Sequence, residues 1–225
     1  AYEHINRIVD QLVASDAIEY RDIFAYDKVR IIHNDDILNA FCTPGGFIYV
    51  YTGLIHYLDT EDHLAGVLGH EIAHAERRHS SIRMQKKFGA DRLFELIVLT
   101  SPISLRDAWA LAILTELTGL KYGRAQEAEA DDYSVRYLED TDYACNGTAG
   151  FFAKISREGA GGSVPEFLST HPASDNRVRD INRMAEKVGC STELGDQSNW
   201  HALQASLPPP AEAPEVSEDA AEESL

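Results

Sequence analysis

The chain has 225 residues, of which 44% are hydrophobic and 25% are charged, and its formal net charge is −17 at pH 7. This composition is that of a folded globular domain, with room for short appendages. The negative charge argues against a nucleic-acid partner, because such partners favour a basic surface. No apolar run reaches the roughly 20 residues that a membrane-spanning helix needs. Because the chain starts with Ala1 rather than Met, we expect that an upstream segment was cleaved or that the sequence was trimmed, and either is compatible with an earlier signal peptide or anchor.

The first predicted elements are one helix and a small amount of β structure. Residues 3–14 place isoleucine, valine and leucine at helical intervals, which predicts an amphipathic helix. Residues 29–33 are typical of a strand. Between residues 39 and 51 the turn Pro44-Gly45-Gly46 separates two β-prone runs, so a β-hairpin is expected there.

Helices dominate the rest of the chain. One helix is predicted from Asp62 to about Lys87, with an apolar stripe along one face. Further helical stretches are predicted at residues 91–99, 105–120, 124–138 and 175–188, of which 175–188 is expected to be the last well-formed helix. The predicted fold class is therefore α+β and mostly helical.

The composition changes near the C-terminus. Residues 1–205 are predicted to form one folded domain, and residues 206–225 are predicted to be a disordered tail rich in Pro, Ala and Glu. A solvated tail is the default interpretation of such an acidic segment.

Three cysteines, Cys42, Cys145 and Cys190, provide neither a disulfide framework nor a CxxC metal motif. A Cys145–Cys190 pair is the first to test in an oxidising compartment, and three free thiols are the alternative. The sequence leaves this choice open.

The pattern HExxH occurs at His70-Glu71-Ile72-Ala73-His74. Residues four apart lie on one helical face, so both imidazoles can reach a single metal ion. Glu71 lies one position round the helix, close enough to contact a water on the metal without being a ligand itself. Zinc lowers the pKa of such a water towards about 7, and a carboxylate can then take its proton. The pattern predicts one zinc ion per chain with Glu71 as catalytic base.

A third ligand can come from two places. In the metzincin pattern a third histidine follows the second by six residues, but that position holds Ser80. The adjacent His79, on a continuing helix, points away from the face of His70 and His74. We therefore expect His79 to be a surface or packing histidine.

The alternative is a glutamate from a later helix. Glu127 and Asp131 are four residues apart in the predicted helix 124–138 and share a face, whereas Glu129 points to the opposite side. Alone, this segment is typical of a solvated acidic helix. Together with the HExxH motif it favours Glu127 as the third ligand, leaving an open position as a catalytic zinc site requires. Asp131 can accept the outer ring N–H of a ligating histidine and fix its tautomer.

At this point the chain resembles the HtpX-like and CAAX-prenyl-protease-type family of zinc metallopeptidases, which are compact gluzincins. Four blocks carry the resemblance: Asn39-Ala40-Phe41 with Pro44-Gly45-Gly46 and Thr52-Gly53-Leu54; residues 64–74; residues 127–131; and Thr170-His171-Pro172 with Arg177. The resemblance implies a zincin-like domain with a short β-sheet beside the HExxH helix. It also implies Glu127 as third ligand, with Asp131 behind the ligands.

The resemblance further implies how a substrate binds and where the protein acts. The edge strand of the hairpin is expected to pair with a polypeptide substrate in extended conformation. With no spanning segment predicted, the chain is similar to the soluble or peripherally anchored members, and a periplasmic or cell-envelope location is expected. Cys42, next to the matched Phe41, is expected to be a small packing residue.

His171 has no obvious role in a core. Our hypothesis is that it approaches the metal site and either hydrogen-bonds the oxyanion or reversibly occupies the open position. The alternative is a loop histidine that caps a helix.

Taken together, these features predict a zinc metalloendopeptidase acting on unfolded or damaged envelope proteins. A binding or chaperone-like module that retains the zinc fold is the main alternative, and a structural-zinc protein is the third. A binding module has no need of the base, so an intact Glu71 favours the enzyme.

Overall fold

The computed structural model describes residues 1–88, 121–158, 166–172 and 176–208. The strands are β1 (Val29–Ile32), β2 (Ala40–Cys42) and β3 (Ile48–Tyr51), and the helices are α1 (Tyr2–Val13), α2 (Thr52–Tyr57), α3 (Glu61–Glu76), α4 (His79–Phe88), α7 (Arg124–Leu138), α8 (Gly147–Glu158), α9 (Glu166–Thr170), α10 (Arg177–Val188) and α11 (Ser198–Ser206). The helices predicted at 91–99 and 105–120 lie outside the described residues, as does most of the predicted tail. No helix in the described part of the chain is long and apolar enough to cross a membrane.

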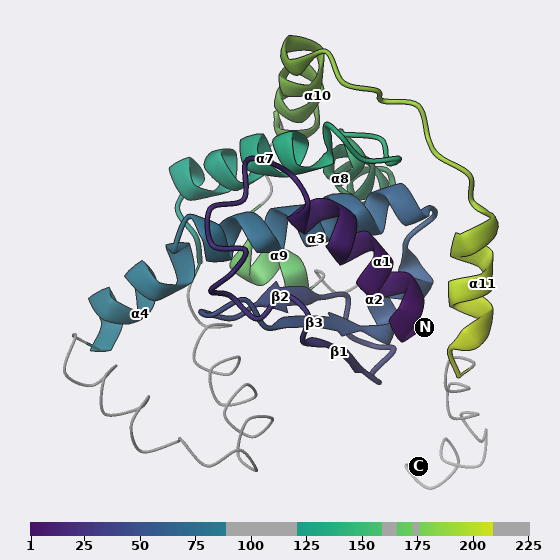
Figure 1. The fold of residues 1–225 in the computed structure, drawn as a ribbon, viewed down its shortest axis with the longest axis horizontal. Helices are drawn as coiled ribbons and strands as arrows, with labels where there is room; N and C mark the ends of the chain where they lie inside the picture. The colour runs from purple at the N-terminus through teal and green to yellow at the C-terminus, as the bar shows by residue number, and fades with distance from the viewer. Residues whose placement is uncertain (89–120, 159–165, 173–175, 209–225) are drawn as a thin grey trace, which may run out of the picture.

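The architecture is α+β and mostly helical, as predicted. A three-stranded sheet in the order β1-β3-β2 lies on one side of α3, and α7 lies on the other side (Figure 1). β2 and β3 form the predicted antiparallel hairpin, and β1 pairs parallel to β3, which the sequence did not predict. The hairpin turn uses Gly45 and Gly46 at φ values of 94° and 88°, which favour glycine.

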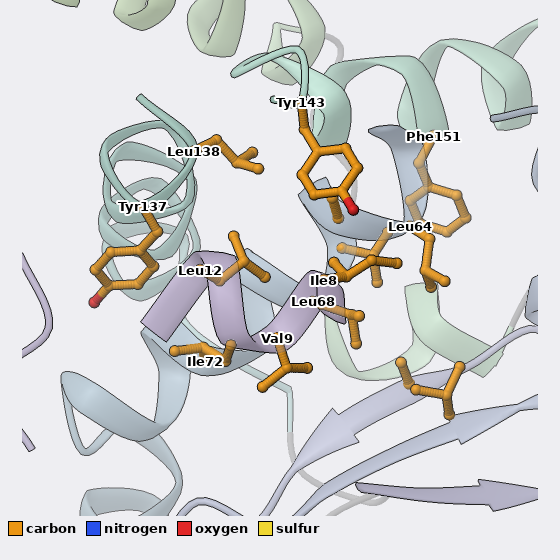
Figure 2. Packing of buried hydrophobic residues seen from close by; sticks show 14 of the residues in the cluster. Ile8, Val9, Leu12, Leu64, Leu68, Ile72, Tyr137, Leu138, Tyr143 and Phe151 are labelled. Atoms are coloured by element: carbon orange, nitrogen blue, oxygen red, sulfur yellow. The ribbon is translucent and has the colours of Figure 1, made fainter. Parts of the chain in front are cut away.

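The core is built around α3, which carries the HExxH motif. Every residue of α3 except His63 is buried. Figure 2 shows apolar side chains of α1 and α7 packed around those of α3. Residues labelled there include Ile8, Val9 and Leu12 of α1, Leu64, Leu68 and Ile72 of α3, and Tyr137 and Leu138 of α7. A helix enclosed in this way holds its side chains in fixed positions.

The motif helix is shorter than predicted. Instead of continuing to Lys87, α3 ends at Glu76, and a new helix begins at His79. Arg78 lies between them with φ of 58°, a left-handed conformation that ends the first helix. Neither glycine nor proline marks the break, so the two strongest stop signals are missing from the sequence.

Tertiary contacts hold this break in place. The Glu76 carboxylate accepts hydrogen bonds from the backbone N–H groups of Glu19 and Tyr20 and from the hydroxyl of Tyr26. Arg77 pairs with Glu129 of α7, with its Nε 2.8 Å from Oε1. These partners are distant in the sequence, and for that reason spacing along the chain did not reveal the break.

The C-terminal region also differs from the prediction. Residues 177–188 form α10 as expected, but α11 follows it and is therefore the last described helix. Its buried side chains are Trp200 and Leu203. Two buried positions in nine residues give too weak a periodicity to predict a helix.

Cys145 and Cys190 form a disulfide with an S–S distance of 2.00 Å, the pairing that the sequence placed first. The bond joins the segment before α8 to Cys190, which lies two residues after the end of α10. Cys42 is a free thiol and is buried, as expected for a packing residue.

Reduction of this disulfide is expected to destabilise the fold. Closing a loop with a sequence separation of 45 removes chain entropy worth about 4 kcal/mol from the unfolded state. The midpoint of thermal unfolding should fall by about 10 °C in reductant. The double variant Cys145→Ala/Cys190→Ala is the control, because its midpoint should not respond to reductant. An unchanged midpoint in wild type whose thiols are shown to be reduced would contradict the prediction.

Candidate metal centre

Four buried side chains converge at one point: His70, His74, Glu127 and His171. One nitrogen or oxygen atom from each lies within 4.8 Å of the others. The Nε2 atoms of His70 and His74 are 3.0 Å apart. The Oε1 atom of Glu127 is 3.5 Å from Nε2 of His74 and 3.1 Å from Nδ1 of His171. The structure thus brings together the three predicted ligands and the histidine of uncertain role.

Local structure explains why these four meet. His70 and His74 project from one face of α3, one turn apart. Glu127 lies in the first turn of α7, which packs against α3. His171 follows α9, and its ring is stacked on Phe167 with a centroid distance of 4.3 Å. His171 is 2% exposed, so it is part of the buried site rather than a loop residue in solvent.

This donor set fits a divalent metal ion. Neutral imidazoles and a carboxylate are the ligands that such ions take in catalytic sites. Burial lowers the pKa of His74 and of His171 below the ordinary value, which keeps both rings in the neutral form that can bind metal. Burial opposes ionisation of Glu127, but the nearby rings of His171, His74 and His70 hold its pKa below its usual range. The carboxylate is therefore ionised and ready to bind a cation.

Glu71 lies beside this cluster and is not part of it. It is 2% exposed, and its Oε1 atom is 3.4 Å from Nε2 of His171. Burial raises the pKa of Glu71 to about 8, although the neighbouring ring of His70 and a backbone hydrogen bond from Cys42 oppose this shift. A carboxylate with a raised pKa is suited to accept a proton near neutral pH.

Asp131 and Arg177 form a second layer behind His70. The Oδ1 atom of Asp131 is 2.9 Å from Nδ1 of His70. Arg177 of α10 contacts both oxygens of Asp131 at 2.7 and 2.8 Å, and its Nη1 is 2.7 Å from Oε2 of Glu127. Arg177 thus holds two buried carboxylates at once. Arg177 is among the residues that carry the family resemblance, but the sequence alone indicates no role for it.

His79 is not where the sequence placed it. It is 2% exposed, and its Nδ1 atom is 3.0 Å from Nδ1 of His74. The expected direction assumed one continuous helix, and the left-handed Arg78 invalidates that assumption. Glu129 points away from the metal cluster as predicted, and Nε2 of His79 lies 3.2 Å from its Oε2 atom.

Tyr122 is a site residue that sequence reasoning missed. The centroid of its ring is 3.8 Å from that of His74 and 4.9 Å from that of His171. Its hydroxyl is 2.7 Å from the hydroxyl of Ser80. No motif includes Tyr122. Its backbone N–H donates to the carbonyl of Thr170, the residue before His171, and this contact between distant segments gives no signal in the sequence.

Comparisons with known proteins agree with this geometry. Residues 2–185 match Peptidase family M48. A putative beta-barrel assembly-enhancing protease of Vibrio cholerae is 30% identical over 91% of this chain and 43% of its own length. The mitochondrial metalloendopeptidase OMA1 of Schizosaccharomyces pombe is 31% identical over 76% of this chain and 51% of its own. A beta-barrel assembly-enhancing protease of Yersinia pestis is 31% identical over 83% of this chain and 39% of its own.

The chain thus spans about half, or less, of the length of these relatives. The family match nevertheless covers most of the chain, including the motif helix, α7 and His171. It confirms the resemblance to metallopeptidases stated from the sequence and shows that the chain belongs to peptidase family M48.

Proposed function

We propose that this chain is a zinc metalloendopeptidase domain in which His70, His74 and Glu127 hold the metal and Glu71 is the catalytic base. The observation that carries the proposal is the convergence of four buried donor atoms next to a buried carboxylate that is not one of them. The family match supports the activity, and relatives that carry the name metalloendopeptidase support internal cleavage of polypeptides.

The chemistry divides between the ion and the protein. A bound zinc ion supplies Lewis acidity, which makes water a better nucleophile and polarises the scissile carbonyl. Glu71 accepts the proton of the attacking water and passes it to the leaving amine nitrogen. Asp131 orients the ring of His70, and Arg177 balances the charge of Asp131 and Glu127.

The substrate is proposed to bind as an extended strand along β2. β2 is an edge of the sheet among the described strands and packs against α3. The backbone of Cys42, at the end of β2, hydrogen-bonds Glu71, so this edge runs past the catalytic carboxylate. Backbone pairing gives affinity without demanding one sequence, which suits unfolded or damaged proteins.

The protein is proposed to act in the cell envelope, where it can also associate peripherally with a membrane. The disulfide between Cys145 and Cys190 supports an oxidising compartment. Relatives named beta-barrel assembly-enhancing protease support envelope proteins as substrates. Labelling of free thiols in acid-quenched cell extracts tests the oxidising location. If Cys145 and Cys190 were reduced in cells, the proposed compartment would be contradicted.

Metal removal tests the proposed activity. Purified protein should contain one zinc per chain and should cleave an unfolded protein such as reduced casein. A chelator should abolish cleavage, and added zinc should restore it. Protein that binds casein without cleaving it would instead be a binding module. Protein that unfolds on zinc removal and never cleaves would favour a structural metal.

His171→Ala is expected to weaken zinc binding at least about tenfold, because we propose that His171 reversibly occupies the position that His70, His74 and Glu127 leave open around the metal. Its Nδ1 atom is 3.3 Å from Nε2 of His70, within reach of the same ion. Zinc affinity measured by competition with a chromophoric chelator checks this. Loss of turnover with unchanged affinity would favour hydrogen bonding to the oxyanion instead. His201→Ala, at an exposed position in α11, is the matched control. If His171→Ala changed neither zinc affinity nor turnover, both the metal-binding role and the oxyanion role of His171 would be refuted.

A further inference from the structure

The outer nitrogen of His74 has a partner that the HExxH pattern does not include. Nε2 of His74 faces Nε2 of His70 at 3.0 Å, on the side of the proposed metal. Nδ1 therefore points the other way, and it lies 3.0 Å from Nδ1 of His79. The two rings are nearly edge-on, with an interplanar angle of 69°. In this arrangement one ring can donate a hydrogen bond to the nitrogen of the other.

The contacts fix the direction of the hydrogen bonds. When Nε2 of His74 binds a metal, its Nδ1 carries the hydrogen and donates it. Nδ1 of His79 must then accept, so the hydrogen of His79 is on Nε2. That atom lies 3.2 Å from Oε2 of Glu129, which accepts. The other oxygen of Glu129 accepts from Nε of Arg77 at 2.8 Å.

The break between α3 and α4 at Arg78 places His79 in this position. The left-handed conformation of Arg78 redirects the backbone, so that α4 begins at His79 and the His79 side chain turns back towards α3. The backbone N–H of Arg78 bonds to the carbonyl of Ala75, which closes the turn. A non-glycine residue is uncommon in this conformation, so surrounding contacts must stabilise it.

We propose that His79 and Glu129 are positioning residues that fix the tautomer and the orientation of His74. The proposal rests on the proposed function, since it takes His74 to be a metal ligand. It gives the two histidines of the motif different outer partners. His70 is held directly by the carboxylate of Asp131, and His74 is held by a neutral imidazole that is backed by the carboxylate of Glu129.

Variants at His79 separate hydrogen bonding from packing. His79→Asn retains an oxygen near the place of Nδ1, so it can still accept from His74. His79→Leu fills the space but cannot accept. Glu129→Gln keeps the shape of the carboxylate and removes its charge. Asp132→Asn is the matched control, because Asp132 is on the same helix and pairs with the exposed Arg136.

The measurements are zinc affinity of the full chain by chelator competition, the visible spectrum with cobalt in place of zinc, and thermal unfolding of the metal-free protein. His79→Leu should weaken zinc binding about 10–100-fold and alter the cobalt spectrum. His79→Asn should recover most of the affinity, Glu129→Gln should show a smaller loss, and Asp132→Asn should match wild type.

Two results would overturn the inference. One is wild-type zinc affinity in His79→Leu. The other is equal loss in the Asn and Leu variants with a matching fall in metal-free stability, which would assign His79 to packing alone. If His79→Leu does not fold, Glu129→Gln and His79→Asn decide the question. Wild-type protein that binds no zinc would instead refute the proposed function, so the two failures are distinguishable.

Discussion

Glu71→Gln is expected to lower the rate of peptide-bond cleavage by about 10³-fold, with zinc content unchanged. The amide has nearly the shape of the carboxylate but cannot accept the proton of the attacking water. Burial raises the pKa of Glu71 to about 8, so the folded state disfavours the ionised carboxylate relative to the unfolded state. The charge of Glu71 therefore does not stabilise the fold. The metal-free variant should therefore unfold at the same temperature as wild type or a higher one. Turnover of an unfolded protein and metal analysis on the same samples check both statements.

A second carboxylate serves as the control for Glu71. Glu186→Gln makes the same change at an exposed position of α10 and should leave cleavage at the wild-type rate. If Glu71→Gln cleaves as fast as this control, Glu71 is not the base. If Glu71→Gln loses zinc together with activity, Glu71 acts on metal binding rather than on proton transfer.

Arg177→Leu is expected to destabilise the fold by about 3–5 kcal/mol and to weaken zinc binding. Arg177 is 5% exposed and contacts both Asp131 and Glu127. Its removal leaves two buried carboxylates without their shared cation, and each repels the other. Asp131 can then no longer hold His70 in the ligating orientation. Thermal unfolding of the metal-free chain and chelator competition measure the two effects.

Neighbouring substitutions define what Arg177 contributes. Arg177→Lys keeps the charge but loses the planar fork that contacts both oxygens of Asp131, so it should recover only part of the stability. Arg179→Leu removes an exposed arginine on the same helix that pairs with Asp180, and it should change stability by less than about 0.5 kcal/mol. Equal stability and zinc affinity in Arg177→Leu and Arg179→Leu would contradict the prediction.

Local signals in the sequence were sufficient for much of the fold. α1, β1, the hairpin and α7 lie within a residue or two of their predicted bounds, because each has a clear periodicity or a glycine turn. α8 and α9 were not predicted, and α11 was missed because few of its residues are buried. The parallel pairing of β1 with β3 depends on contacts between segments, which periodicity does not report.

The candidate site divides in the same way. The sequence by itself determined that His70 and His74 share a helical face with Glu71 beside them, and that Glu127 and Asp131 share a face of another helix, since a spacing of four residues sets these directions. Only the tertiary structure decided that Arg177 joins the two carboxylates and that His79 and Glu129 stand behind His74. Both outcomes depend on contacts between segments that are distant in the sequence. Packing of α10 against α7 brings Arg177 to the carboxylates. The left-handed Arg78, held by distant partners of Glu76 and Arg77, turns His79 towards His74.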